Sequence, residues 1–229
     1  GKLKRRMIFM PPGHAKSTYS SVHFPAYYLG VNPHNCIIGA SHTQDLAERF
    51  SKKTRSIVQS SAYHELYGFG ISQDSRAVAA WETERGGEFK AAGVGAGIAG
   101  RRSDVGLIDD PIRSREDAES ELVRDRVWEW YLADFRTRLK PEGAIIIIQT
   151  RWSETDLAGR ILPEKWSGES GEFDCRDGRH WRVLCIQAKC TRRDDPLGRS
   201  VGAYLWPEWF PVSHWTPMER DPTPAGRRS

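Results

Sequence analysis

Lys16, Ser17 and Thr18 have the side chains and the spacing that bind nucleotide phosphates, and they follow a short apolar run. In the phosphate-binding loop G-x-x-x-x-G-K-[ST], backbone N–H groups cradle the phosphates, the lysine reaches the β- and γ-phosphates, and the hydroxyl binds Mg²⁺. Met10 and Ala15 stand at the two glycine positions, so only the catalytic end of the pattern is kept. Lys-Ser-Thr also begins ordinary helices, so the surrounding elements must decide between the two interpretations.

The ligand expected at this loop is ATP with Mg²⁺. Lys16 is the expected catalytic cation, and Ser17 is an expected ligand of the metal. The expected ATP-binding residues of the loop are Pro12, Gly13, His14, Ala15, Lys16, Ser17 and Thr18.

Two adjacent carboxylates, Asp109 and Asp110, follow a second apolar run at residues 105–108. We expect Asp109 to hold Mg²⁺ through its water shell and Asp110 to orient and activate the attacking water. The alternative is a helix N-cap, with Pro111 beginning the next element. Two acids at the end of a buried strand cost too much electrostatically for capping alone, which favours catalysis.

Gln149 and Thr150 follow a third apolar run, residues 144–148. If this strand lies between the first two, their polar side chains are placed to sense the γ-phosphate or its attacking water. The alternative is that they merely end a strand.

Residues 95–100 satisfy the dinucleotide fingerprint G-x-G-x-x-G, but another apolar run follows almost at once. There is no room for the helix whose N-terminus must meet a pyrophosphate, so the match is rejected. The segment is better interpreted as a mobile loop that presents Arg101 and Arg102. Guanidinium groups there suit stabilisation of phosphoryl charge, in cis or in a neighbouring subunit, or contact with a DNA backbone.

The order of elements predicts an α/β fold with a mainly parallel sheet flanked by helices. The interval between Lys16 and Asp109 admits an additional strand and helix, as in the additional-strand, catalytic-acid class of three-layer P-loop NTPases. Pro25 should kink or restart the helix that follows the loop, near residues 23–24. The expected strands are residues 7–10, 36–40, 105–108 and 144–148, with a further strand-like run at 181–186. The expected helices are residues 43–59 and 115–139. The second is expected to be one long amphipathic helix whose aromatic residues pack in the core.

The length and composition of the chain limit its domain organisation and the kinds of partner it can have. A chain of 229 residues with 38% hydrophobic residues is long enough for one large domain, here residues 1–211 and irregular from about 163, with 212–229 as a tail or the start of a linker. No run approaches the roughly 18 apolar residues of a membrane span and no leader is evident, so no membrane contact is expected. A net charge of +4 permits a polyanionic partner, and four scattered cysteines suit a reducing cytoplasm.

Six segments together resemble the ATPase domain of the large terminase subunits of tailed bacteriophages, which has a RecA-like P-loop fold. They are PPGHAKST, ASHTQDLAERF, GVGAGIAGRRSD, LIDDPI, WEWYLADFRTRLKPEGAIIIIQTRWSETDLAGR and LWPEWFP. The resemblance implies an ATP-driven motor that moves double-stranded DNA into a procapsid, as a ring of identical subunits, usually taken to be five, on the portal protein, with the small terminase subunit as a further partner. It places the protein in the host bacterial cytoplasm, transiently docked on the portal. It also implies that Thr150 couples hydrolysis to movement and that Arg101, or secondarily Arg102, is an arginine finger.

The chain departs from that family at both ends. Residues that contact adenine upstream of the first strand and a C-terminal RNase H-like nuclease are both missing, so an isolated ATPase domain without nuclease activity is expected. Three alternatives stay open: a DNA helicase or remodelling ATPase, an inactive nucleotide-binding prophage remnant, and metal-dependent cleavage by Asp109 and Asp110. The last is disfavoured because it leaves Lys16 without a role.

Overall fold

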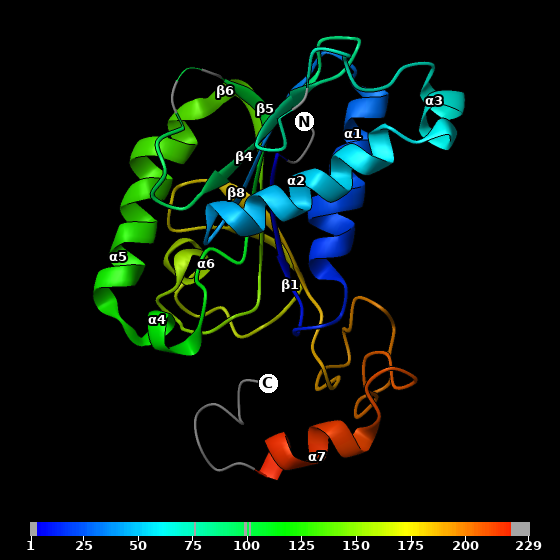
Figure 1. Cartoon of the computed structure of the whole chain (residues 1–229). Coiled ribbons are helices and arrows are strands. Elements are labelled where there is room, and N and C mark those ends of the chain that lie inside the picture. The colour runs from blue at the N-terminus through cyan, green and yellow to red at the C-terminus, as the bar shows by residue number, and fades with distance from the viewer. Residues whose placement is uncertain (1–3, 76, 99, 101, 221–229) are drawn as a thin grey trace.

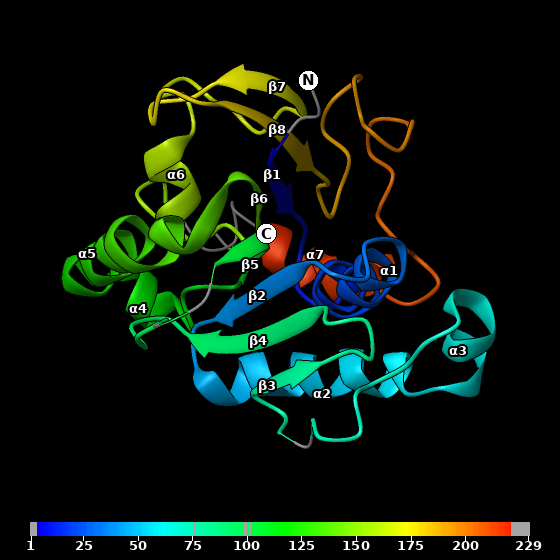
Figure 2. The same ribbon diagram turned by 90° about the horizontal axis from the view of Figure 1, so that it is seen from above.

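The computed structural model describes residues 4–75, 77–98, 100 and 102–220. Within these ranges, eight strands form one sheet (Figure 1), and their order is β3-β4-β2-β5-β6-β1-β8-β7 (Figure 2). Only β3 and β7 run antiparallel to their neighbours. The strands are β1 (Arg5–Phe9), β2 (Cys36–Ser41), β3 (Ala80–Glu82), β4 (Glu88–Gly93), β5 (Ser103–Asp109), β6 (Leu139–Gln149), β7 (Gly171–Asp174) and β8 (His180–Cys185).

Helices cover both faces of the sheet and make three layers, as the view from above shows (Figure 2). On one face lie α1 (Phe24–Val31), α2 (Gln44–Val58) and α3 (Ser61–Tyr67). On the other lie α4 (Arg115–Glu119), α5 (Glu121–Trp130) and α6 (Leu157–Ile161). The last helix, α7 (Val212–Arg220), lies beyond the edge of the sheet at which β1 ends.

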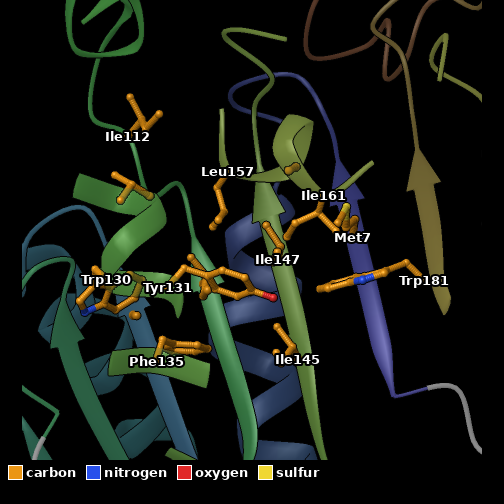
Figure 3. Close-up of a cluster of buried hydrophobic side chains, with 14 of the residues drawn as sticks. Met7, Ile112, Trp130, Tyr131, Phe135, Ile145, Ile147, Leu157, Ile161 and Trp181 are labelled. Atoms are coloured by element: carbon orange, nitrogen blue, oxygen red, sulfur yellow. The ribbon is translucent and has the colours of Figure 1, made fainter. Parts of the chain in front are cut away.

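The central strands are apolar on both sides, as expected of parallel strands covered by helices. Along β6, Ile147 packs into the core beneath α5 and α6, whereas Ile148 packs into the core beneath α1 and α2. Figure 3 shows the first of these cores, where Tyr131 and Trp181 extend across the face of the sheet. Packing in both cores holds β5 and β6 in place, and it thereby positions the residues at the ends of these two strands.

Most of the predicted elements are confirmed, with boundaries shifted by a few residues. Thr43 begins the predicted helix by accepting a hydrogen bond from the Leu46 amide at 3.3 Å, as an N-cap residue does. The sequence reasoning missed β3, β4 and β7. All three are short, and β4 carries Glu88 and Lys90 among its apolar residues, so none resembles a continuous buried run.

The prediction of one long helix over residues 115–139 is wrong. The chain turns extended at Ser120, where ψ is 116°, and the Ser120 hydroxyl accepts a hydrogen bond from the Val123 amide to begin α5. The segment then widens into a π-helix (Tyr131–Phe135) and tightens into a 3₁₀ turn (Arg136–Arg138), and Leu139 already belongs to β6. A serine that caps a new helix competes with continuation of the old one, and an apolar spacing of four does not report that competition. The expected core role of the aromatic residues is confirmed for Tyr131, which is fully buried.

The predicted restart near residues 23–24 is confirmed. A π-helix (Thr18–His23) follows the loop, and α1 begins at Phe24. Pro25 has no N–H to donate to the carbonyl of Ser21, four residues earlier. The Thr54 hydroxyl of α2 lies beside this turn, 3.4 Å from that carbonyl oxygen and 3.2 Å from the Val22 carbonyl oxygen.

The end of the described chain is helical. The predicted domain boundary at residue 211 coincides with the start of α7. That residues 212–229 form a tail or a linker stays a prediction. None of the helices in the described ranges is long and apolar enough to cross a membrane.

Candidate nucleotide-binding site

The loop between β1 and the π-helix has the backbone of an anion-binding turn. Gly13 and Ala15 both have positive φ, 77° and 62°. The left-handed region is open to glycine but costs an alanine about 1 kcal/mol, so the fold holds Ala15 there against its preference. Alternating backbone of this kind directs successive N–H groups toward one concave side, which is how such loops hold phosphates.

Lys16 is the residue around which the site is organised. Its side chain is only 8% exposed, and its Nζ lies 2.9 Å from Asp110 Oδ2. The two residues are 94 positions apart in the sequence. The pairing confirms that the loop after β1 and the end of β5 meet.

Asp109 ends β5 and is 1% exposed. Its Oδ2 accepts a hydrogen bond from the Ser21 hydroxyl at 2.6 Å, while Oδ1 is buried with no protein donor. Burial, and secondarily the negative charge of Asp110, raises the pKa of Asp109 to about 6, although the hydroxyls of Ser21 and Ser17 and the charge of Lys16 oppose the rise. A cation bound at the oxygen without a protein partner would offset the energetic cost of burying this carboxylate.

The donor set therefore fits Mg²⁺. The ion is usually held by one or two protein oxygens together with waters and substrate phosphates, rather than by a protein cage. Asp109 and the Ser17 hydroxyl supply such oxygens. The described residues contain no group of three or more His, Cys, Asp or Glu side chains that could hold a metal by themselves.

Asp110 is held by the end of β6 as well as by Lys16. Its amide donates to the Ile148 carbonyl at 2.8 Å, and its Oδ1 accepts from the Thr150 amide at 2.9 Å. The Thr150 hydroxyl in turn donates to the carbonyl of Met10, 3.4 Å away, at the beginning of the loop. Because β6 lies between β1 and β5, Lys16, Asp110 and Thr150 converge at one edge of the sheet.

Gln149 lies beside this group. It is 3% exposed, its Oε1 has no hydrogen-bond partner, and it is in register with Phe9 of β1. It also lines a small cavity together with Asp110, Thr150 and Trp152. The structure thus places an unsatisfied acceptor close to the carboxylate, and its role as a sensor stays a prediction.

Of the two candidate arginines, the one that the structure describes, Arg102, is not part of this group. Arg102 is exposed and precedes β5, whereas Asp109 is the last residue of that strand. At roughly 3.3 Å per residue, the strand separates them by about 20 Å. Arg101 lies outside the described residues.

The C-terminal segment covers the loop, which the sequence reasoning did not foresee. His14 is 4% exposed; its Nδ1 lies 2.8 Å from the Pro12 carbonyl and its Nε2 lies 3.2 Å from the Leu205 carbonyl. The Phe210 ring stacks on His14 with centroids 4.4 Å apart. The available signal was LWPEWFP itself, an apolar and aromatic run inside a segment that otherwise reads as irregular.

The sequence reasoning also missed Ser21, Ser41 and His42. Ser41 and His42 follow one another at the end of β2 and contact the backbone of the tandem carboxylates. Polar residues after an apolar run at the carboxyl edge of a parallel sheet were the available signal, the same one that identified Asp109 and Gln149.

The fold and the site define a P-loop NTPase with an additional strand between the strand that precedes the loop and the strand that carries the paired acids. The family model described as terminase large subunit, T4likevirus-type, N-terminal, matches residues 7–194. The chain belongs to this family. Among curated proteins, none matches it.

Solved structures share the fold. The Thermus phage P74-26 large terminase ATPase domain aligns over 100% of this chain and 86% of its own, with a TM-score of 0.57 and 15% identity. A mutant of that domain, with an arginine replaced by alanine, aligns over 98% of this chain and 85% of its own, with a TM-score of 0.51 and 15% identity. The HK97 bacteriophage large terminase is 11% identical over 72% of this chain, with a TM-score of 0.45, and the match covers 37% of its length.

Proposed function

We propose that this domain hydrolyses ATP and that hydrolysis drives double-stranded DNA into a viral procapsid. The observation that carries the proposal is the convergence of Lys16, Asp110 and Thr150, joined by contacts of 2.9 Å from Asp110 to each of the other two. A phosphate-binding cation, a carboxylate able to activate water and a coupling residue are the parts that such a motor needs.

Each residue takes a part in this proposal. The backbone of residues 12–16 holds the phosphates, and Lys16 neutralises their β/γ charge. Ser17 and Asp109 would hold Mg²⁺, which would screen the charge of the phosphate oxygens. Asp110 accepts a proton from the attacking water as its oxygen bonds to the γ-phosphorus. The bond from that phosphorus to the β–γ bridging oxygen breaks, ADP leaves, and Lys16 stabilises the charge that develops on the bridging oxygen.

The step from hydrolysis to movement passes through Thr150. Its amide contacts Asp110 and its hydroxyl contacts Met10, so it responds both to the water-activating group and to the loop. Family membership supports the partners proposed for this motor: double-stranded DNA, the portal protein, the small terminase subunit and further copies of the chain in a ring of five. We place it in the host bacterial cytoplasm, docked on the portal during packaging, and expect no nuclease activity from these residues.

Steady-state ATP hydrolysis tests the proposal. Lys16→Ala and Asp110→Asn should each lower turnover by at least about 100-fold, because one removes the phosphate cation and the other the water-activating carboxylate. Lys53→Ala, which changes an exposed lysine of α2, should leave turnover unchanged. Full activity in either site variant would refute the assignment.

Two further assays separate the alternatives. A packaging motor protects duplex DNA inside procapsids without unwinding it, so strand displacement by the wild type would favour a helicase. ATP binding without turnover, even on portal, would favour an inactive nucleotide-binding module.

A further inference from the structure

The end of β2 contacts the backbone of both carboxylates at the end of β5. The Ser41 hydroxyl donates to the Asp109 carbonyl at 2.7 Å, and His42 Nδ1 lies 3.1 Å from the Asp110 carbonyl. A carbonyl oxygen can only accept, so His42 must carry its proton on Nδ1. The contact therefore fixes the tautomer of the His42 ring as well as its place.

Asp110 needs such a contact because its backbone is strained. Its φ is 43°, in the left-handed region that residues other than glycine rarely adopt. It also precedes Pro111, and a residue before proline is sterically pushed toward extended backbone. Strain of this kind persists only where neighbouring groups hold the residue in place.

One of the contacts that hold Asp110 is lost when the site works. Under the proposed function, Lys16 must leave the Asp110 carboxylate to reach the nucleotide phosphates. The Thr150 amide then remains on Oδ1, and the His42 ring remains on the main-chain carbonyl. The His42 contact is independent of the carboxylate, so it can fix the backbone while Oδ2, the oxygen that Lys16 releases, changes partner.

We propose that His42 is a positioning residue for ATP hydrolysis, whose Nδ1–H holds the backbone of Asp110 so that its carboxylate faces the attacking water once Lys16 has left. This inference rests on the proposed function. His42 acts through Asp110, and it is distinct from Lys16 and Ser17, which hold the phosphates and the metal.

The test compares two substitutions at residue 42 with a matched control. His42→Ala removes the donor, whereas His42→Asn keeps an N–H close to the place of Nδ1. His34→Ala is the control: His34 lies just before β2, at the opposite end of the strand, and its Nδ1 makes the same kind of contact, 2.6 Å from the Arg85 carbonyl.

His42→Ala should lower kcat by about 10- to 100-fold and change KM for ATP by less than about threefold, because a displaced catalytic group affects turnover while the phosphate ligands remain. His42→Asn should recover kcat to within about fivefold of the wild type, and His34→Ala should match the wild type. Unchanged kcat in His42→Ala, or an equal loss in the alanine and asparagine variants, would overturn the proposal.

A measurement that does not need turnover separates this inference from the proposed function. Nitrogen-15 NMR of the wild-type imidazoles should show the neutral His42 ring protonated at Nδ1, whether or not ATP is hydrolysed. A ring protonated at Nε2 alone would overturn the positioning role even in an active enzyme. A wild type that shows the expected tautomer but does not hydrolyse ATP contradicts the proposed function, and with it the role of His42 in hydrolysis.

Discussion

The Lys16 ammonium lies 2.9 Å from the Asp110 carboxylate, so the phosphate-binding cation and the proposed water-activating anion are each other's partners in this state. Lys16 is buried, and a buried cation is costly unless it is paired. The ion pair keeps the site stable without nucleotide. Phosphates entering the loop must compete with Asp110 for Lys16, so nucleotide binding and release of the carboxylate are one event.

Asp110→Asn should therefore separate binding from hydrolysis. The asparagine no longer holds Lys16 by charge, so ATP affinity should stay the same or rise by a few fold while turnover is lost. Lys16→Ala should instead weaken binding by about 10-fold or more. Titration with a fluorescent ATP analogue measures both. A loss of affinity in Asp110→Asn as large as that in Lys16→Ala would show that the pair does not compete with phosphate.

The burial of Asp109 predicts a pH dependence of stability. Its pKa is raised from 3.8 to about 6 in the folded chain, so the folded state holds a proton that the unfolded state has released. For a carboxyl with a raised pKa, stability falls as pH rises from about 4 to about 6, and the full penalty is present above that range. Asp109→Asn removes the buried charge and should stabilise the nucleotide-free protein at pH 7.5, by an amount on the order of 2 kcal/mol.

Urea unfolding of both proteins at pH 7.5 and pH 5 measures this effect. The advantage of Asp109→Asn should shrink at pH 5, where the folded wild type is largely protonated at this residue. Saturating Mg²⁺ and nucleotide should reverse the order of stability at pH 7.5, because the wild-type carboxylate then has a cation to hold. An advantage independent of pH would indicate that burial of the charge is not its cause.

The sequence predicted which side chains gather at this edge of the sheet, because they lie at or just after the ends of strands. Lys16, Asp109 and Gln149 each follow an apolar run, and parallel strands bring their carboxyl ends to one edge whatever the intervening chain does. The contacts made by His42 and Ser21 could not be predicted, since they depend on register between strands and on the rotation of a π-helix. The break at Ser120 was missed because hydrophobic spacing indicates which face of a helix is buried, whereas a capping serine marks where a new helix begins.

The C-terminal segment should stabilise the phosphate-binding loop through Phe210. A Cβ added at Gly13 would lie 2.7 Å from Phe210 Cζ, so the ring rests directly on the loop as well as on His14. Phe210→Ala should lower the free energy of unfolding by about 1 to 2 kcal/mol and raise KM for ATP. Trp209→Ala is the matched control: this neighbouring aromatic is 65% exposed, and its loss should cost less than about 0.5 kcal/mol. Equal effects of the two substitutions would contradict the packing role of Phe210.

The position of Arg102 predicts how an arginine finger would have to work. About 20 Å of strand separates it from Asp109 of its own chain, beyond the reach of an arginine side chain, so it can act only on the nucleotide of a neighbouring subunit. Turnover per subunit should then rise with protein concentration or on addition of portal, because assembly supplies the guanidinium that stabilises phosphoryl charge.

Mixing variants decides between the two arginines. Arg101→Ala or Arg102→Ala, whichever is the finger, should be inactive alone but should recover part of its turnover when mixed with Lys16→Ala, since one subunit then supplies the arginine and the other an intact loop. The other arginine variant should keep the concentration dependence of the wild type. Turnover that does not depend on concentration or portal, together with no recovery in any mixture, would rule out a finger acting between subunits.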